Sequence, residues 1–232
     1  GNNITANNQY GIYLYGSYNN KFYHNNFIEN TRHVYDYSWD NPETPYSVNT
    51  WDDGYPSGGN YWSNYNGRDL FSGPYQNEAG SDGIGDPPYT IAAYNKDRYP
   101  LMAPFSTFDA GVWNGTAYNV DIFGNSTVSR FKVSPDQKTI SFNITGTEGT
   151  TGFCRITIPN AIVENLWQGN YTVLLNGEPW PFRNRTDTTN TYIHINYTHS
   201  EHKIVIIPEF PSATILLLCT LTTLTATILT RK

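Results

Sequence analysis

Short stretches in which apolar and polar residues alternate run through most of the chain and predict β-strands. In residues 1 to about 35 the stretches are very short, and asparagine bounds each of them. Alternation with a period of two places apolar side chains on one face of a strand. The side chains expected to point inward here are Ile4, Ile12, Leu14, Phe22 and Phe27.

These strands form an imperfect repeat, in which residues 2–7 align with residues 20–25 at an offset of 18. Asparagine tolerates the left-handed backbone of tight corners, and stacked asparagine side chains can form a ladder between successive coils. Such a repeat is typical of a solenoid, where each coil needs a neighbour to cover its core. We therefore expect the coils to continue upstream of Gly1.

The repeat is lost in residues 36 to 104, which are rich in Trp, Tyr, Gly and Pro. Aromatic side chains can cover the open end of a last coil, and Gly- and Pro-rich turns stop strand propagation. We predict that residues 1–104 are the C-terminal coils and the aromatic, glycine-rich cap of a parallel β-helix.

A second domain is predicted for residues 105–207, where longer alternating strands are separated by turns such as Asn176-Gly177. Seven strands with no convincing helix favour an immunoglobulin-like β-sandwich. The predicted strands are residues 117–123, 127–133, 139–144, 153–158, 171–175, 192–197 and 203–207.

The C-terminal residues predict a membrane anchor. After a short linker at residues 208–211, residues 212–230 contain no charged side chain, and Arg231 and Lys232 follow. A helix of that length matches the hydrocarbon core of a bilayer, and terminal cations favour the cytoplasmic side. The expected fold class is therefore all-β, with the end of a right-handed parallel β-helix, then a β-sandwich, then one transmembrane helix. The expected location is the extracellular face of the cell membrane, with an export signal upstream.

Three stretches carry a resemblance to a known family: residues 59–65 (GNYWSNY), residues 82–86 with Tyr89, and residues 97–102 (DRYPLM). Together with the asparagine-bounded repeat they resemble NosD-like parallel β-helix proteins of archaea, over about residues 1–104. The resemblance implies a right-handed β-helix of the carbohydrate-binding and sugar-hydrolase type. Residues 208–211 (PEFP) resemble the PEF-type C-terminal sorting signal of archaeal surface proteins, which implies a sortase-like processing enzyme as a partner.

The composition of the chain limits its possible binding partners and covalent modifications. The net charge of −6 argues against a nucleic-acid partner, which would need a basic face. Cys154 lies in a folded segment and Cys219 in the expected membrane run, so we expect no disulfide between them. Seven Asn-X-Ser/Thr sequons predict a glycoprotein. They begin at Asn3, Asn114, Asn125, Asn143, Asn170, Asn184 and Asn196.

The sequence contains candidate ligands for two metals, calcium and copper. Calcium is the better candidate, because Asp82 and Asp86 flank a glycine-rich turn and Glu78 and Asp69 are near in sequence. The alternative is an ordinary Asp-Gly turn whose carboxylates cap backbone amides. Copper sites need clusters of His, Cys or Met, and the strongest cluster is a set of three histidines that we interpret as solvated. They are His194, His199 and His202, so the resemblance does not carry copper binding onto this chain.

Sugar binding is the remaining chemistry. The predicted glycan-stacking residues are Trp39, Trp51, Tyr61 and Trp62, and four aspartates lie near aromatic residues: Asp36, Asp40, Asp52 and Asp53. A carboxylate pair beside stacking rings would suit sugar hydrolysis, but solvated turn aspartates are commoner. We favour a non-catalytic, membrane-anchored surface protein that serves as a stalk or binds a polysaccharide or cell-surface glycan. A β-helix polysaccharide hydrolase or lyase with its active coils upstream and a copper-delivery protein are the alternatives.

Overall fold

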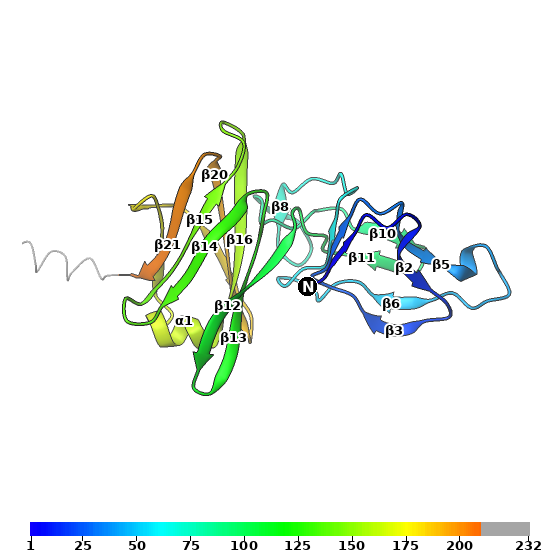
Figure 1. Ribbon diagram of the computed structural model, residues 1–232, viewed down its shortest axis with the longest axis horizontal. Helices are drawn as coiled ribbons and strands as arrows, with labels where there is room; N and C mark the ends of the chain where they lie inside the picture. The colour runs from blue at the N-terminus through cyan, green and yellow to red at the C-terminus, as the bar shows by residue number, and fades with distance from the viewer. Residues whose placement is uncertain (210–232) are drawn as a thin grey trace, which may run out of the picture.

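The computed structural model describes residues 1–209, which fold into two β-rich halves (Figure 1). Short strands make up the first half, residues 1–104, and long antiparallel strands make up the second. The N-terminus lies between the two halves (Figure 1).

Parallel pairing defines the first half. Its strands form one three-stranded and two two-stranded parallel sheets. The sheets are β1 (Asn3–Thr5), β4 (Asn26–Ile28) and β7 (Tyr61–Trp62); β2 (Tyr10–Leu14) and β5 (Arg32–Asp36); and β3 (Tyr18–Lys21) and β6 (Val48–Thr50).

The predicted repeat offset is wrong, but the predicted asparagine ladder is confirmed. Asn3 pairs with Asn26, and the bond from Asn2 to Asn25 likewise spans 23 residues instead of 18. Asn2 Nδ2 donates to Asn25 Oδ1 at 3.0 Å, and Asn25 Nδ2 donates to Asn60 Oδ1 at 3.1 Å. Asparagine side chains therefore stack from one parallel strand layer to the next.

The predicted fold class needs correction in this half, because residues 1–104 hold no continuous solenoid sheet. The three parallel sheets contain two or three strands each, and the strand pairs of the cap are antiparallel. The cap elements are the 3-10 helix η1 (Tyr37–Trp39) and the strand pairs β8 (Phe71–Ser72) with β9 (Glu78–Ala79) and β10 (Tyr89–Ala92) with β11 (Asn95–Asp97).

Aromatic side chains fill the core of the first half. Trp51 and Trp62 are fully buried against Phe27, and the Phe27 and Trp62 rings stack with centroids 4.2 Å apart. Of the residues predicted to point inward, Leu14 and Phe27 are buried; Ile4, Ile12 and Phe22 are partly buried and pack against the same cluster.

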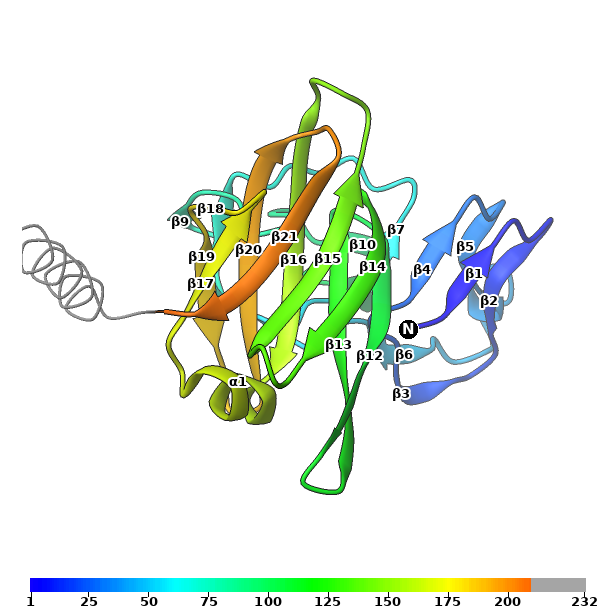
Figure 2. The ribbon, with the colours of Figure 1, turned by 60° about the vertical axis from the view of Figure 1, so that its left-hand side comes forward.

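The second half is a sandwich of two five-stranded antiparallel sheets (Figure 2). One sheet has the order β12 (Phe105–Trp113), β13 (Thr116–Gly124), β16 (Thr151–Pro159), β20 (Asn190–Thr198) and β19 (Arg183–Thr186). The other has the order β14 (Thr127–Ser134), β15 (Thr139–Thr145), β21 (His202–Pro208), β17 (Tyr171–Leu175) and β18 (Glu178–Pro179). One apolar cluster, rich in isoleucine, fills the space between them.

All seven strands predicted for this domain are present, but β12, β18, β19 and one helix were not predicted. The helix α1 (Asn160–Trp167) covers one end of the sandwich (Figure 2) and buries Ile162, Val163, Leu166 and Trp167. Its last residue is followed by Gln168 in the left-handed conformation and by Gly169, a common way to end a helix. Eight residues are too few for the helical period to stand out in the sequence.

The predicted transmembrane helix and the predicted single-pass membrane location are not supported by the structure. Within residues 1–209 no helix has the length and apolar character needed to cross a bilayer. The expected span, residues 212–230, and the end of the PEFP linker lie outside the described residues.

Candidate functional site

The outer side of the β2–β5 sheet carries a continuous group of aromatic rings, which we call the aromatic face. It begins on β2, crosses to β5 and continues into η1. Its members are Tyr10, Tyr13, Tyr15, Tyr35, Tyr37 and Trp39.

Strand register creates the aromatic face. Tyr13 is the direct partner of Tyr35 in the parallel pairing, so both side chains leave the same side of the sheet. Their neighbours Leu14 and Val34 point the other way, into the core. Alternation along both strands therefore gives one apolar core side and one aromatic outer side.

The rings of the aromatic face form a row in which each ring contacts its neighbour. Tyr10 stacks on Tyr35 with centroids 4.4 Å apart, and Tyr13 lies 5.4 Å from Tyr35. Tyr37 continues the row, 6.4 Å from Tyr13 and 5.0 Å from Tyr15. Offset and tilted aromatic pairs at these separations are attractive, so the rings support each other in place.

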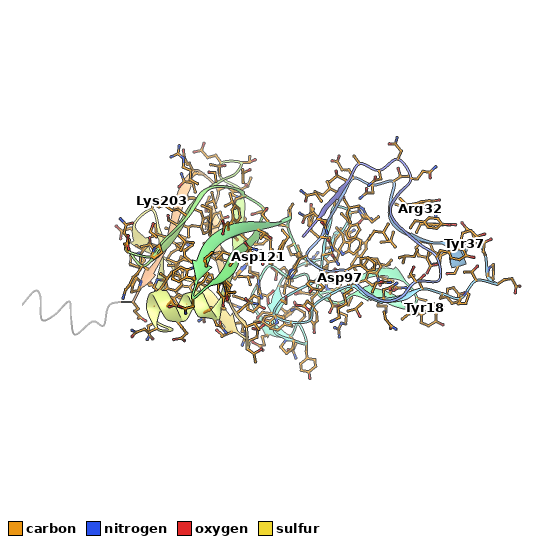
Figure 3. The ribbon with its side chains drawn as sticks, turned by 60° about the horizontal axis from the view of Figure 1, so that its bottom comes forward. Tyr18, Arg32, Tyr37, Asp97, Asp121 and Lys203 are labelled. Carbon is orange, nitrogen blue, oxygen red and sulfur yellow. The ribbon has the colours of Figure 1, made fainter. Side chains whose placement is uncertain are left out.

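Exposure differs along the aromatic face. The side chains of Tyr13 and Tyr15 are 52% and 63% exposed, whereas Tyr35 is buried. Tyr35 donates a hydrogen bond to Asp40 Oδ2 at 2.6 Å, and this bond raises the pKa of Tyr35 to about 12. A buried, hydrogen-bonded ring thus holds the exposed rings at a fixed position. In Figure 3, Arg32 and Tyr37 lie together at the end of the molecule far from the sandwich.

Two of the predicted glycan-stacking residues cannot contact a ligand, because Trp51 and Trp62 belong to the core. Tyr61 is half-buried and packs against an apolar cluster at the junction of the two halves, formed by Ile84, Leu101, Phe105 and Phe123. Trp39 is half-buried and packs edge-on against Tyr35 at the border of the aromatic face. Alternation in segment 11–15 could have revealed part of the face, since Tyr13 and Tyr15 occupy outward positions; Tyr10 has the same parity as Leu14 and could not have been placed there in this way.

Two of the four aspartates near aromatic residues stabilise turns. Asp36 is buried and accepts hydrogen bonds from the amides of Ser38 and Ser47. Asp52 forms a two-point ion pair with Arg98, with bonds of 3.0 and 2.6 Å. Asp40 accepts the Tyr35 hydroxyl, and Asp53 is exposed. Asp36 and Asp52 are therefore occupied in structural roles.

The predicted calcium ligands also cap backbone amides. Asp69 accepts from the amides of Asp82 and Gly83 at 3.0 and 2.7 Å, and Asp86 accepts from two further amides at 2.9 and 3.1 Å. Glu78 pairs with Arg185. In residues 1–209 no three His, Cys, Asp or Glu side chains lie close enough to hold a metal ion. The structure does not support a calcium site, and the Asp-Gly turn explains the sequence pattern.

The three C-terminal histidines do not form a copper site, and they are not all solvated as we expected. His194 and His199 are buried. Both ring nitrogens of His199 lie within 2.8 Å of hydroxyl oxygens, those of Thr150 and Ser126. His202 contacts Asn176 instead. Burial also raises the pKa of the Cys154 thiol, which lies in the sandwich core, so it offers no thiolate to a metal.

Six of the seven sequon asparagines are exposed, and Asn143 is half-buried. Asn114 lies in the tight turn between β12 and β13, with its backbone at φ 51° beside Gly115 at φ 80°. In contrast, the Nδ2 atoms of Asn125, Asn184 and Asn196 already donate hydrogen bonds within the protein. Glycosylation stays a prediction, and Asn114 is the sequon best placed for it.

Comparison with known proteins finds a family similarity in the first part of the chain. The family model described as periplasmic copper-binding protein (NosD) matches residues 1–67. No curated protein and no solved structure matches the chain. The matched segment contains the parallel strands and the whole aromatic face, so this part of the chain is NosD-like.

Proposed function

We propose that this protein binds glycans through the aromatic face. The observation that carries the proposal is the exposure of Tyr13 and Tyr15 on a row of mutually supporting rings. Exposed aromatic groups of this kind mark interaction surfaces in proteins. The similarity to NosD-like proteins falls on the same residues, and it supports a periplasmic or surface setting.

The chemistry of the face fits a sugar. A pyranose ring has flat apolar faces of C–H groups and a rim of hydroxyls. Tyrosine offers a flat apolar ring with a hydroxyl at its tip, and it loses little conformational entropy on binding. The carboxylate of Asp40 and the guanidinium of Arg32 lie at the border of the face and can bond to hydroxyls. The net charge of −6 makes nucleic acid a poor alternative for a stacking surface.

Copper delivery gains no support from these residues. The family name refers to copper, but the His, Cys, Asp and Glu residues within 1–209 do not gather into a metal site. The leading proposal is therefore a non-catalytic glycan-binding role for this chain.

Titration calorimetry of the full chain tests the proposal. The probes are hexasaccharides of β-linked glucose, mannose and xylose, compared with free glucose. We expect at least one hexasaccharide to bind, and Tyr13→Ala and Tyr15→Ala each to weaken that binding by about tenfold, since each removes one stacking contact. Tyr75→Ala is the matched control, because Tyr75 is 84% exposed and lies outside the aromatic face. Absence of binding to all three, or equal losses in all three variants, would refute the proposal.

A further inference from the structure

A polar cavity of about 370 Å³ lies where the cap meets the sandwich, and we call it the seam cavity. Its walls come from residues 55–82 on one side and from β16, β19 and β20 on the other. The volume is within the usual range for small-molecule sites, about 300–1,000 Å³. The seam cavity is separate from the aromatic face, which has no residue in its lining.

A row of basic side chains forms the sandwich wall of the seam cavity. Arg155 on β16 is the direct strand partner of His194 on β20, and His194 is the partner of Arg183 on β19. These three strands are neighbours (Figure 2), so the three side chains lie side by side on the sheet face opposite the apolar core. Antiparallel register thus builds a cationic surface from residues far apart in the sequence.

The charges of the seam cavity do not fully cancel. Arg155 lies 3.5 Å from Asp82 Oδ2, and Arg185 pairs with Glu78. Arg183 has no carboxylate partner within residues 1–209, and its Nη1 donates only to the Ala79 carbonyl. A Cβ at Gly80 would lie 1.9 Å from Arg183 Nη2, so the glycine leaves room for this guanidinium. One cationic group therefore faces the seam cavity without a counter-ion from the described chain.

Unpartnered polar atoms concentrate at the seam cavity. Six buried side-chain atoms in residues 1–209 have no hydrogen-bond partner, and four of them belong to residues that line it. The four are Arg155 Nε, His194 Nδ1, Tyr55 Oη and Asp82 Oδ2; Tyr55 and Asp82 lie near each other, and Asp82 Oδ2 also has its 3.5 Å ion pair with Arg155. The side chains of Asp82, Arg155 and His194 are all more than nine-tenths buried. Buried polar groups are normally paired, so this set indicates a site that a polar ligand completes.

The mixture of groups defines the ligand. A simple anion would satisfy Arg183 but would be repelled by the Asp82 carboxylate, whose Oδ2 has only the long 3.5 Å contact with Arg155 and can accept a further hydrogen bond. A neutral sugar would supply hydroxyls for Asp82, Tyr55 and His194 but would leave Arg183 uncompensated. We propose that the seam cavity binds a sugar acid, a polyhydroxylated molecule that places its carboxylate on Arg183 and its hydroxyls on the unpartnered groups.

Calorimetry with D-glucuronate, D-glucose and inorganic sulfate on the full chain tests this site. We expect glucuronate to bind about tenfold or more tightly than either other ligand, because only it matches both the charge and the hydroxyl groups. Arg183→Gln should weaken glucuronate binding by about tenfold or more. Arg130→Gln is the matched control, an exposed arginine on the opposite sheet, and should leave binding unchanged. Because Arg183 is exposed, the variant is expected to keep the wild-type melting temperature, which is measured alongside.

Several results would overturn the proposal: no binding of glucuronate, equal binding of sulfate or glucose, or equal affinities of Arg183→Gln and wild type. Tyr13→Ala separates this site from the aromatic face, since it should leave glucuronate binding intact. Competition with tetragalacturonate separates two sources of the ligand. Displacement of glucuronate identifies the end of an acidic polysaccharide, and lack of displacement identifies a free sugar acid.

Discussion

At the scale of single residues, His194 shows how the fold controls a buried polar side chain. His194 is 3% exposed, and its environment is cationic: Arg155 and Arg183 flank it, while Asp82 and Glu78 line the opposite wall of the same cavity. Burial first, and then the two arginines, lower the pKa of His194 to about 3. The folded protein therefore holds this histidine neutral throughout the physiological range.

The variant His194→Gln tests that electrostatic environment. Below pH 6.5 the unfolded chain binds a proton at His194 that the folded chain does not, so lowering the pH favours the unfolded state. We expect the stability of the wild type relative to His194→Gln to fall by about 1–2 kcal/mol between pH 7.5 and pH 5. Urea denaturation at both pH values measures the difference.

Comparing the wild type with His194→Gln cancels the pH-dependent contributions that other titratable groups make to the free energy of unfolding. Burial raises the pKa values of Asp69 and Asp97 to about 7, so these groups lose stabilising free energy as the pH rises from 4 to 7. His24 and His33 have lowered pKa values and act in the opposite direction. Both proteins share all four groups. A pH-independent difference would show that His194 is already protonated, or solvated, in the folded state.

At the scale of elements, the asparagine ladder fixes how the parallel strands stack. The ladder ends at Asp97. The backbone amide of Asn60 donates a hydrogen bond to Asp97 Oδ2 at 2.7 Å, and the indole of Trp62 donates to the same oxygen at 2.9 Å. In a second ladder, the side chain of Asn20 donates a hydrogen bond to the side chain of Asn49, and the backbone amide of Asn49 donates to the side chain of Asn95. Asp97 and Asn95, both on β11, thus close the two ladders inside the cap.

Asn60→Ala tests the energetic role of the buried ladder. Asn60 is fully buried, accepts two hydrogen bonds from Asn25, and donates to the carbonyls of Phe22 and Trp51. The substitution leaves these groups unpaired in the core, so we expect a loss of about 2–4 kcal/mol in the free energy of unfolding. Chemical denaturation measures it.

Asn7→Ala is the control for this measurement. Asn7 makes the equivalent ladder bond to Asn30 on the exposed surface, where water can replace it. The expected loss is under about 1 kcal/mol. Similar losses for the two variants would mean that the ladder contributes through strand register alone and not through buried hydrogen bonds.

The elements also show which parts of the fold the sequence can predict. Alternation located seven of the ten sandwich strands, and asparagine-bounded strands predicted the ladder. The stacking distance escaped prediction, because successive ladder partners are 23, 35 and 37 residues apart. These unequal loops leave no fixed period in the sequence. The short edge strands β18 and β19 escaped because their exposed positions show no apolar alternation.

The candidate sites were also harder to predict, because they depend on strand register and on contacts between distant parts of the chain. The aromatic rings of Trp51 and Trp62 are the most prominent in the sequence, but they lie in the core, whereas the proposed binding surface comes from the register of Tyr13 with Tyr35. The seam cavity depends on Arg155 meeting a cap segment 73 residues away in the chain. Tertiary contacts of this kind have no local sequence pattern.

At the scale of the whole molecule, the two halves meet through both apolar and polar contacts. Ile84 and Leu101 from the cap pack with Phe105 and Phe123 from the sandwich. Arg155 donates to the carbonyls of Asp82 and Pro56, at 2.6 Å in each case. The sandwich thus covers one side of the cap, while the aromatic face lies at the opposite end of the molecule (Figure 3). Within residues 1–209 the sandwich therefore does not cover the aromatic face, the surface proposed to bind glycans.

The most direct test of glycan binding at this face is nuclear magnetic resonance of the full chain with labelled tyrosine rings, titrated with the hexasaccharide that binds most tightly. The account predicts that the ring signals of Tyr13, Tyr15 and Tyr37 shift with ligand concentration, while the signal of Tyr75 stays unchanged. Assignment by single Tyr→Phe variants identifies each signal. Shifts confined to tyrosines of the sandwich, or to Tyr75, would contradict the account.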